Sequence, residues 1–104
     1  MQPETGGRFT VRLLEQDERR ARFQVELATP AATWSGDAEV LARDGAIHFG
    51  AWSGNGEPPE WLRRYTHAAL RTAWRQHAEQ DTWPRRLTRW RDEPGPSREG
   101  SSEP

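Results

Sequence analysis

The chain has 104 residues, with fifteen basic residues against sixteen acidic ones and a formal charge of −1. This length predicts one small domain. No run of about eighteen apolar residues occurs, so no membrane-spanning segment is expected. The chain does not begin with basic residues followed by an apolar stretch, so no signal peptide is expected either. Because cysteine is absent, disulfides, thiol nucleophiles and cysteine-based zinc sites are excluded. We therefore expect a cytoplasmic protein.

The composition indicates a folded domain with a small core. All fifteen basic residues are arginine, and arginine, alanine, glycine and proline together make 44 of the 104 residues, which is typical of a GC-rich genome. Leucine, isoleucine, valine and phenylalanine total only 14, but six tryptophans and a net charge near zero oppose disorder. Such a domain is often stabilised by a partner or by dimerisation.

The first structured segment is predicted to be an antiparallel hairpin. Residues 1–7 contain proline and two glycines without an apolar pattern, which predicts a flexible start. Apolar residues then alternate with polar ones over 8–13 and again over 20–27. A period of two with one polar face is typical of half-buried strands. The polar residues 15–19 form the expected connection.

A second hairpin is predicted around Asp44-Gly45, a favoured pair for a two-residue type I′ turn. This turn places Val40 opposite Phe49 on the inner face, and Trp34 closes one end of the core on the same face. Trp52 then falls on the outer face with His48.

A long helix is predicted from Trp61 to Gln80, after prolines at its start. Its apolar half contains Trp61, Leu62, Tyr65, Ala69, Leu70 and Ala73. The segment 82–91 is rich in arginine and tryptophan, and its pattern favours a short helix over an extended strand. Trp83, Leu87 and Trp90 would then align and cover the outer face of the sheet. Residues 92–104, with three prolines, two glycines and three serines, predict a disordered acidic tail.

These elements predict one α+β domain over residues 8–91. The expected fold is a four-stranded antiparallel sheet of two hairpins, covered on one face by the long helix and followed by a short terminal segment. Charge is unevenly distributed along this chain. Residues 1–60 carry −4 (six arginines, ten acids), residues 61–91 carry +6 (eight arginines, two acids), and residues 92–104 carry −3 (one arginine, four acids).

The basic segment is the candidate functional surface. Its arginines could bind an anionic partner, form a solvated helix face, or pair with the protein's own acids. The predicted binding residues are Arg64, His67, Arg71, Arg75, Arg85, Arg86, Arg89, Trp52, Trp74 and Trp90.

Catalytic and metal-binding patterns are weak. The three histidines show no metal-ligand spacing, Gly54 and Gly56 belong to no phosphate-binding motif, and the serines lie in no nucleophile motif. We therefore expect no enzymatic activity and no cofactor. The leading hypothesis is a binding or adaptor module that engages a protein partner or a second copy of itself. The alternative is a nucleic-acid-binding protein that uses the same arginines for phosphates, with Trp74 and Trp90 for base stacking.

Overall fold

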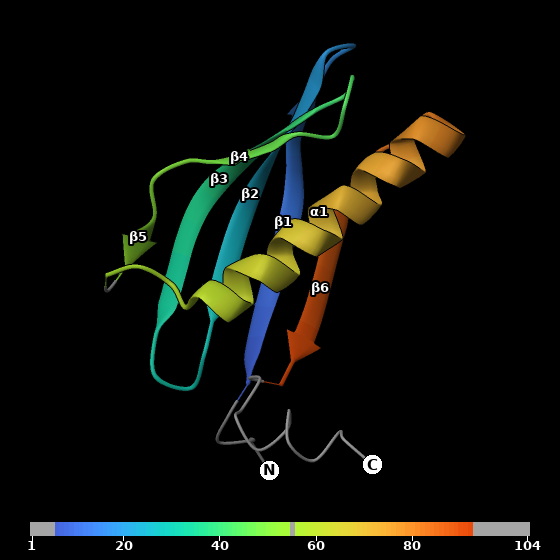
Figure 1. The fold of residues 1–104 in the computed structure, drawn as a ribbon. Coiled ribbons are helices and arrows are strands. Elements are labelled where there is room, and N and C mark those ends of the chain that lie inside the picture. The colour runs from blue at the N-terminus through green and yellow to red at the C-terminus, as the bar shows by residue number, and fades with distance from the viewer. Residues whose placement is uncertain (1–5, 55, 93–104) are drawn as a thin grey trace, which may run out of the picture.

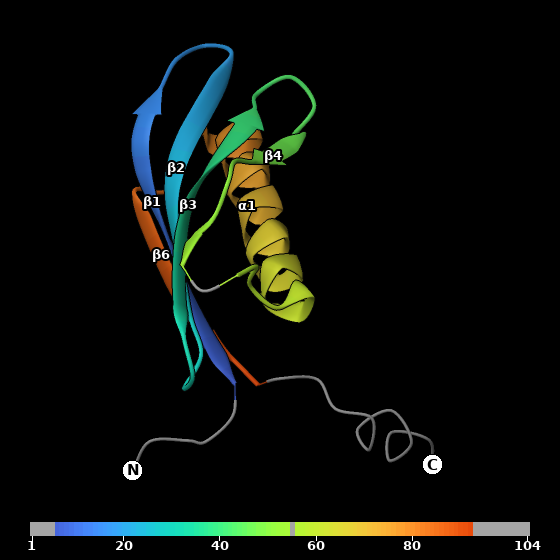
Figure 2. The same cartoon turned by 90° about the vertical axis from the view of Figure 1, so that its left-hand side faces the viewer.

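The computed structural model describes residues 6–54 and 56–92, which form a two-layer α+β domain (Figure 1). One layer is an antiparallel sheet with the strand order β4-β3-β2-β1-β6, and the short β5 also pairs with β3. The other layer is a single helix, which crosses one face of the sheet (Figure 2). The elements are β1 (Gly7–Gln16), β2 (Arg20–Ala28), β3 (Thr33–Leu41), β4 (Ile47–Phe49), β5 (Ser53–Gly54), α1 (Glu60–Gln80) and β6 (Arg86–Arg91).

The first predicted hairpin is confirmed. β1 and β2 pair antiparallel so that Val11 lies opposite Val25, with Phe9 and Leu27 as the next pair on the same face. These side chains are almost completely buried beneath α1, while the alternating polar residues lie on the other face, which we call the open face. The hydrophobic alternation alone fixes this arrangement, because a one-residue slip would expose every apolar side chain.

The second hairpin has its predicted inner face but a different turn. Val40 pairs with Ile47 rather than with Phe49 as predicted, and Phe49 pairs with Ala38, so the connection is longer than two residues. Gly45 has a positive φ of 76°, whereas Asp44 does not, and a type I′ turn requires both. The pairing register differs from the predicted one by two residues, and side chains two residues apart share a face of the sheet. The inner face therefore stays apolar, although the predicted turn is wrong.

Helix α1 covers the sheet with a face slightly different from the predicted one. Its buried residues are Leu62, Thr66, Leu70 and Ala73. Thr66 is tolerated there because its hydroxyl donates a hydrogen bond of 2.8 Å to the Leu62 carbonyl. Asp81 ends the helix in the left-handed conformation, and its amide donates to the His77 carbonyl. Within the described ranges, no helix is long and apolar enough to cross a membrane.

The predicted terminal helix is wrong, because residues 86–91 form strand β6. β6 pairs antiparallel with β1, placing Leu87 opposite Val11 and Thr88 opposite Thr10. The edge of β1 that faces away from β2 would otherwise present unpaired backbone groups, and β6 pairs with residues 7–12 of this edge. With β5 and β6 included, the sheet has six strands rather than four.

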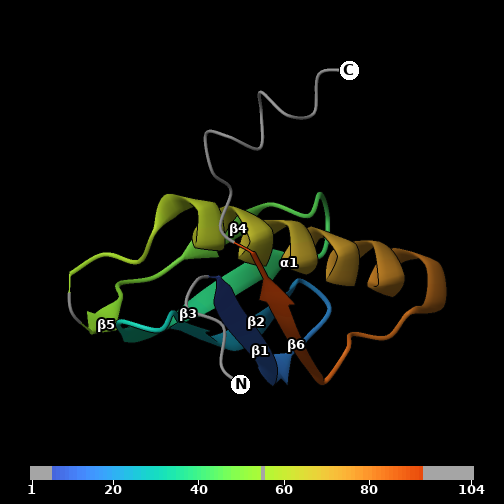
Figure 3. The same cartoon turned by 90° about the horizontal axis from the view of Figure 1, so that it is seen from below.

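The open face of the sheet is not covered by the terminal tryptophans, which corrects a second expectation. Trp83 is 3% exposed on the helix side, where it stacks on His77 at 4.4 Å between ring centroids and meets the Phe23 edge at 6.1 Å. Trp90 does lie on the open face, at its border, and is 39% exposed. No other described element packs against this face (Figure 3).

Trp52 also lies on the other side from the one predicted. Strand β4 ends at Phe49, and Trp52 turns back onto the helix side, with its ring centroid 5.5 Å from that of Phe49. Gly36 makes room for the indole, because a Cβ at this position would lie 2.9 Å from the Trp52 ring. Trp34 is on the helix side as predicted, with 8% exposure.

Candidate protein-binding surface

The arginines of α1 do not all face the same way. Arg64 and Arg75 are exposed on the side of the helix that points away from the sheet, and Arg64 donates to the Glu60 carboxylate at 3.1 Å. His67 is also exposed, but it lies near β4, with its ring centroid 6.4 Å from that of Phe49. The predicted binding residues of the helix are therefore divided between the outer face and the β4 side of α1.

Arg71 and Trp74 connect the helix to the loop between β3 and β4. The Arg71 guanidinium donates to the carbonyls of Asp44 and Gly45, at 3.2 and 3.0 Å. The Trp74 indole N–H donates to the Ala42 carbonyl at 2.9 Å, and the Arg71 guanidinium lies 4.9 Å above the Trp74 ring. Both side chains are thus engaged within the fold, where they bind α1 to this loop.

The remaining predicted residues gather on β6 and the segment before it. Arg85, Arg86 and Arg89 are all exposed, as is Trp90. The register with β1 places Arg86 and Trp90 on the open face and Arg89 on the helix side. The structure therefore brings these residues together on one edge of the sheet and leaves Trp52, Arg71 and Trp74 elsewhere.

An apolar groove runs between α1 and β6, which we call the α1–β6 groove. It has a volume of about 350 Å³, and Arg89 and Arg91 lie on its β6 side. Its α1 wall includes the small side chains of Ala69 and Thr72, and its β6 wall includes Leu87. The groove is lined by Phe9, Tyr65, Ala68, Ala69, Thr72, Ala73, Gln76, Pro84, Leu87, Arg89 and Arg91.

Sequence reasoning missed two members of this groove. Arg91 lies on the helix side of β6, with its guanidinium 5.7 Å from the Tyr65 ring centroid. The alternation of Leu87, Arg89 and Arg91 would have grouped these side chains if the segment had been interpreted as a strand. Tyr65 was assigned to the buried half of α1, but it is only partly buried at the groove.

The outer edge of β6 carries backbone groups that no described strand pairs. The Leu13 amide donates to the Arg85 carbonyl at 2.8 Å, so Leu13 and Arg85 are a hydrogen-bonded pair that continues the β1–β6 register. Hydrogen-bonded pairs alternate along antiparallel strands. The backbone N–H and C=O groups of Thr88 and Trp90 therefore point away from β1, toward the free edge.

Two of these outward carbonyls are occupied by arginines of the same strand. The Arg89 guanidinium donates to the Thr88 carbonyl at 2.9 Å, and the Arg91 guanidinium donates to the Trp90 carbonyl at 3.1 Å. The free edge is thus bordered by positive charge. Charged side chains on an edge strand are a common protection against unwanted strand pairing.

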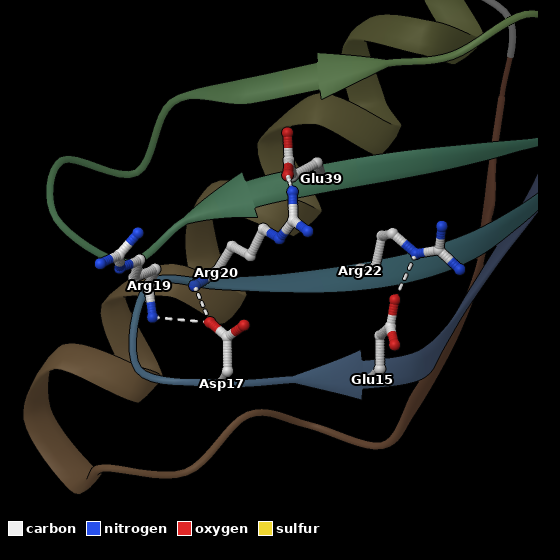
Figure 4. Close-up of polar contacts among 6 residues, drawn as sticks. All are labelled: Glu15, Asp17, Arg19, Arg20, Arg22 and Glu39. Atoms are coloured by element: carbon white, nitrogen blue, oxygen red, sulfur yellow. Dashed lines mark hydrogen bonds and ion pairs between the residues drawn. The ribbon is translucent and has the colours of Figure 1, made fainter.

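The far end of the open face is electrostatically different, because its arginines pair with the protein's own acids (Figure 4). Arg20 forms an ion pair with Glu39, and Arg22 pairs with Glu15 at 3.0 Å. The carboxylate of Asp17 accepts the backbone amides of Arg19 and Arg20, at 2.7 and 3.0 Å. These hydrogen bonds hold the pKa of Asp17 below its ordinary value, and the hydrogen bond to Glu39 raises the pKa of Arg20.

The described residues offer little for catalysis or metal binding. His48 lies opposite Glu39 on the open face, but that carboxylate is already bonded to Arg20. Across residues 6–54 and 56–92, no three histidine or acidic side chains gather into a metal-binding cluster. Two further hollows, of about 440 and 660 Å³, include charged residues of both signs in their lining. The α1–β6 groove, with apolar walls and arginine as its only charged residue type, is the candidate site.

Comparison with known protein families, curated proteins and solved structures finds no match for this chain.

Proposed function

We propose that this protein is a non-enzymatic binding module that engages a protein partner through the α1–β6 groove and the adjoining edge of β6. The observation that carries the proposal is the juxtaposition of three features: an apolar groove, two arginines on one side of it, and a strand edge beside which no described strand pairs. Protein interfaces combine an apolar centre with a polar rim, and arginine and tyrosine are enriched in them.

The nucleic-acid alternative has weaker support from the same geometry. Base stacking requires accessible aromatic faces near cationic groups that follow a phosphate backbone. Trp74 is hydrogen bonded to Ala42 and covered on one side by Arg71, so it is poorly available. Trp90 is exposed and shares the open face with Arg86, whereas Arg89 lies on the helix side. The arginines at the far end of the open face are already paired with acids, so they do not continue a cationic path from Trp90.

Self-association through β6 is also disfavoured. Two copies pairing along this edge would bring a strand with three arginines next to another with three arginines. Like charges on directly paired strands are destabilising. We therefore favour a different protein as the partner.

Site-specific photo-crosslinking in a lysate of the source organism tests this function. A crosslinking amino acid replaces Thr72, which lines the groove, or Ala78, which is exposed on α1 and is not part of the groove lining. We expect a protein adduct from position 72 that survives nuclease treatment and is absent from position 78. Adducts that vanish with nuclease, or that form equally at both positions, would overturn the proposed function.

A further inference from the structure

The free edge of β6 and the α1–β6 groove together define a more specific ligand. Resting on the proposed function, we infer that the partner supplies an extended acidic segment that adds to the sheet as a new strand beside β6. Strand addition uses backbone hydrogen bonds for affinity and alternate side chains for specificity. The outward N–H and C=O groups of Thr88 supply one such hydrogen-bonded pair.

The arginines of β6 select the charge of the added strand. Arg89 and Arg91 currently donate to the carbonyls of Thr88 and Trp90, which an incoming strand needs as acceptors. An acidic strand replaces the hydrogen bonds that are lost. Its backbone amides donate to the Thr88 and Trp90 carbonyls, and its carboxylates accept hydrogen bonds from the displaced guanidinium groups. A basic or neutral strand would leave both guanidinium groups without a replacement partner.

The groove selects the side chain that faces the helix. On a strand added to β6, every second side chain points to the α1 side and lies beside the row formed by Leu87, Arg89 and Arg91. A hollow of about 350 Å³ lined by Tyr65 and Ala69 can receive an apolar side chain there. Because Arg89 and Arg91 lie on this same side, the ligand is an extended segment that carries carboxylates and an apolar residue on one face.

The opposite edge of the sheet offers no comparable template. β4 has three residues and β5 has two, and they are separate strands beside β3. β6 pairs over six residues and is longer than both together. Short edge strands resist strand addition, so β6 is the edge that can extend the sheet.

A fluorescent peptide that repeats Glu-Thr-Val-Thr is the first probe, because it places glutamate and valine in turn on the same face of a strand, and a peptide that repeats Lys-Thr-Val-Thr is its control. We expect the glutamate peptide to bind in an anisotropy titration and the lysine peptide not to bind. Two N-methylated forms of the glutamate peptide, methylated on alternate residues, separate the main-chain contribution. One form should lose at least tenfold in affinity and the other should not, because only alternate amides face β6.

Matched variants of the protein test the same geometry. Thr88→Pro removes an outward N–H without breaking a bond to β1, and proline is accepted at such edge positions. It should weaken binding about tenfold, whereas Thr88→Val should bind normally. The double variant Arg89→Glu with Arg91→Glu should abolish binding, and Arg64→Glu with Arg75→Glu on the outer side of α1 should change it less than about threefold. Circular dichroism confirms that each variant is folded.

The outcomes separate the two proposals. Equal binding by both N-methylated peptides, together with normal binding by a folded Thr88→Pro variant, overturns strand addition but leaves the groove as a protein-binding surface. Failure of the glutamate peptide to bind, or equal binding of the lysine peptide, overturns the acidic ligand. If position 72 gives no protein crosslink that survives nuclease treatment, the proposed function itself is rejected.

Discussion

Substitution of Arg71 distinguishes the sequence-based interpretation from the structural one most clearly, because the first predicts a loss of binding and the second a loss of stability. Arg71 is one of the predicted binding residues, but its guanidinium donates to two loop carbonyls at 3.2 and 3.0 Å and lies over the Trp74 ring. A hydrogen bond to a charged group contributes about 1.5–3 kcal/mol, and a cation–π contact adds about 0.5–1 kcal/mol. Because the site is only partly buried, we expect Arg71→Met to lower the free energy of unfolding by about 2 kcal/mol.

Urea denaturation followed by circular dichroism measures this loss. Arg75→Met is the matched control, because Arg75 is exposed and makes none of these contacts, and it should change stability by less than about 0.5 kcal/mol. Arg71→Lys should fall between the two, since lysine keeps the charge but not the forked geometry. The interpretation is refuted if Arg71→Met is as stable as Arg75→Met, or if it abolishes the crosslink at position 72 while stability is unchanged.

Three further predictions concern the core, a glycine and a carboxylate. Trp83→Ala should cost about 3–5 kcal/mol of unfolding free energy, because this indole is 3% exposed; a loss below 1 kcal/mol in urea denaturation would contradict this. Gly36→Val should displace Trp52 and cost about 1–3 kcal/mol, visible as a shifted Trp52 indole resonance, and an unshifted resonance would oppose it. The Asp17 carboxylate has a lowered pKa in the folded state, so its stabilising contribution is present above about pH 4 and is lost as the pH falls through that lowered value. A carboxyl titration by NMR with a midpoint at or above the ordinary value would count against this assignment.

The parts of the fold that sequence predicts well are those in which side-chain alternation and burial agree. β1 and β2 alternate without exception from Phe9 to Leu13 and from Ala21 to Leu27, so their inner face is determined by pattern alone. The predicted inner face of the second hairpin is confirmed for the same reason. Its turn does not, because Arg71 and Trp74 arrive from the helix and bind the loop carbonyls, which no local pattern indicates.

The terminal strand could not be derived from its own residues. Trp83, Leu87 and Trp90 fit a helical spacing, and the competing strand depends on β1, whose Thr10 hydroxyl lies 3.0 Å from that of Thr88 across 78 positions of sequence. Such a distant pairing has no signature in a single chain of this composition. The candidate site was consequently predicted in part: Arg89 does line the groove, and Arg86 and Trp90 lie on the open face of the same strand. Arg91 and Tyr65 were not predicted as binding residues.

The position of β6 has a dynamic consequence. It is held by a ladder on one side only, so releasing it from β1 requires less free energy than unfolding the whole domain. The amides of Leu87 and Arg89 face β1 and report this release through hydrogen exchange, whereas the Thr88 amide already faces outward. An occupant of the outer edge would therefore slow exchange at amides that it never touches. Occupancy of the edge and local folding of the last strand are linked equilibria, so tighter binding requires a more firmly seated strand.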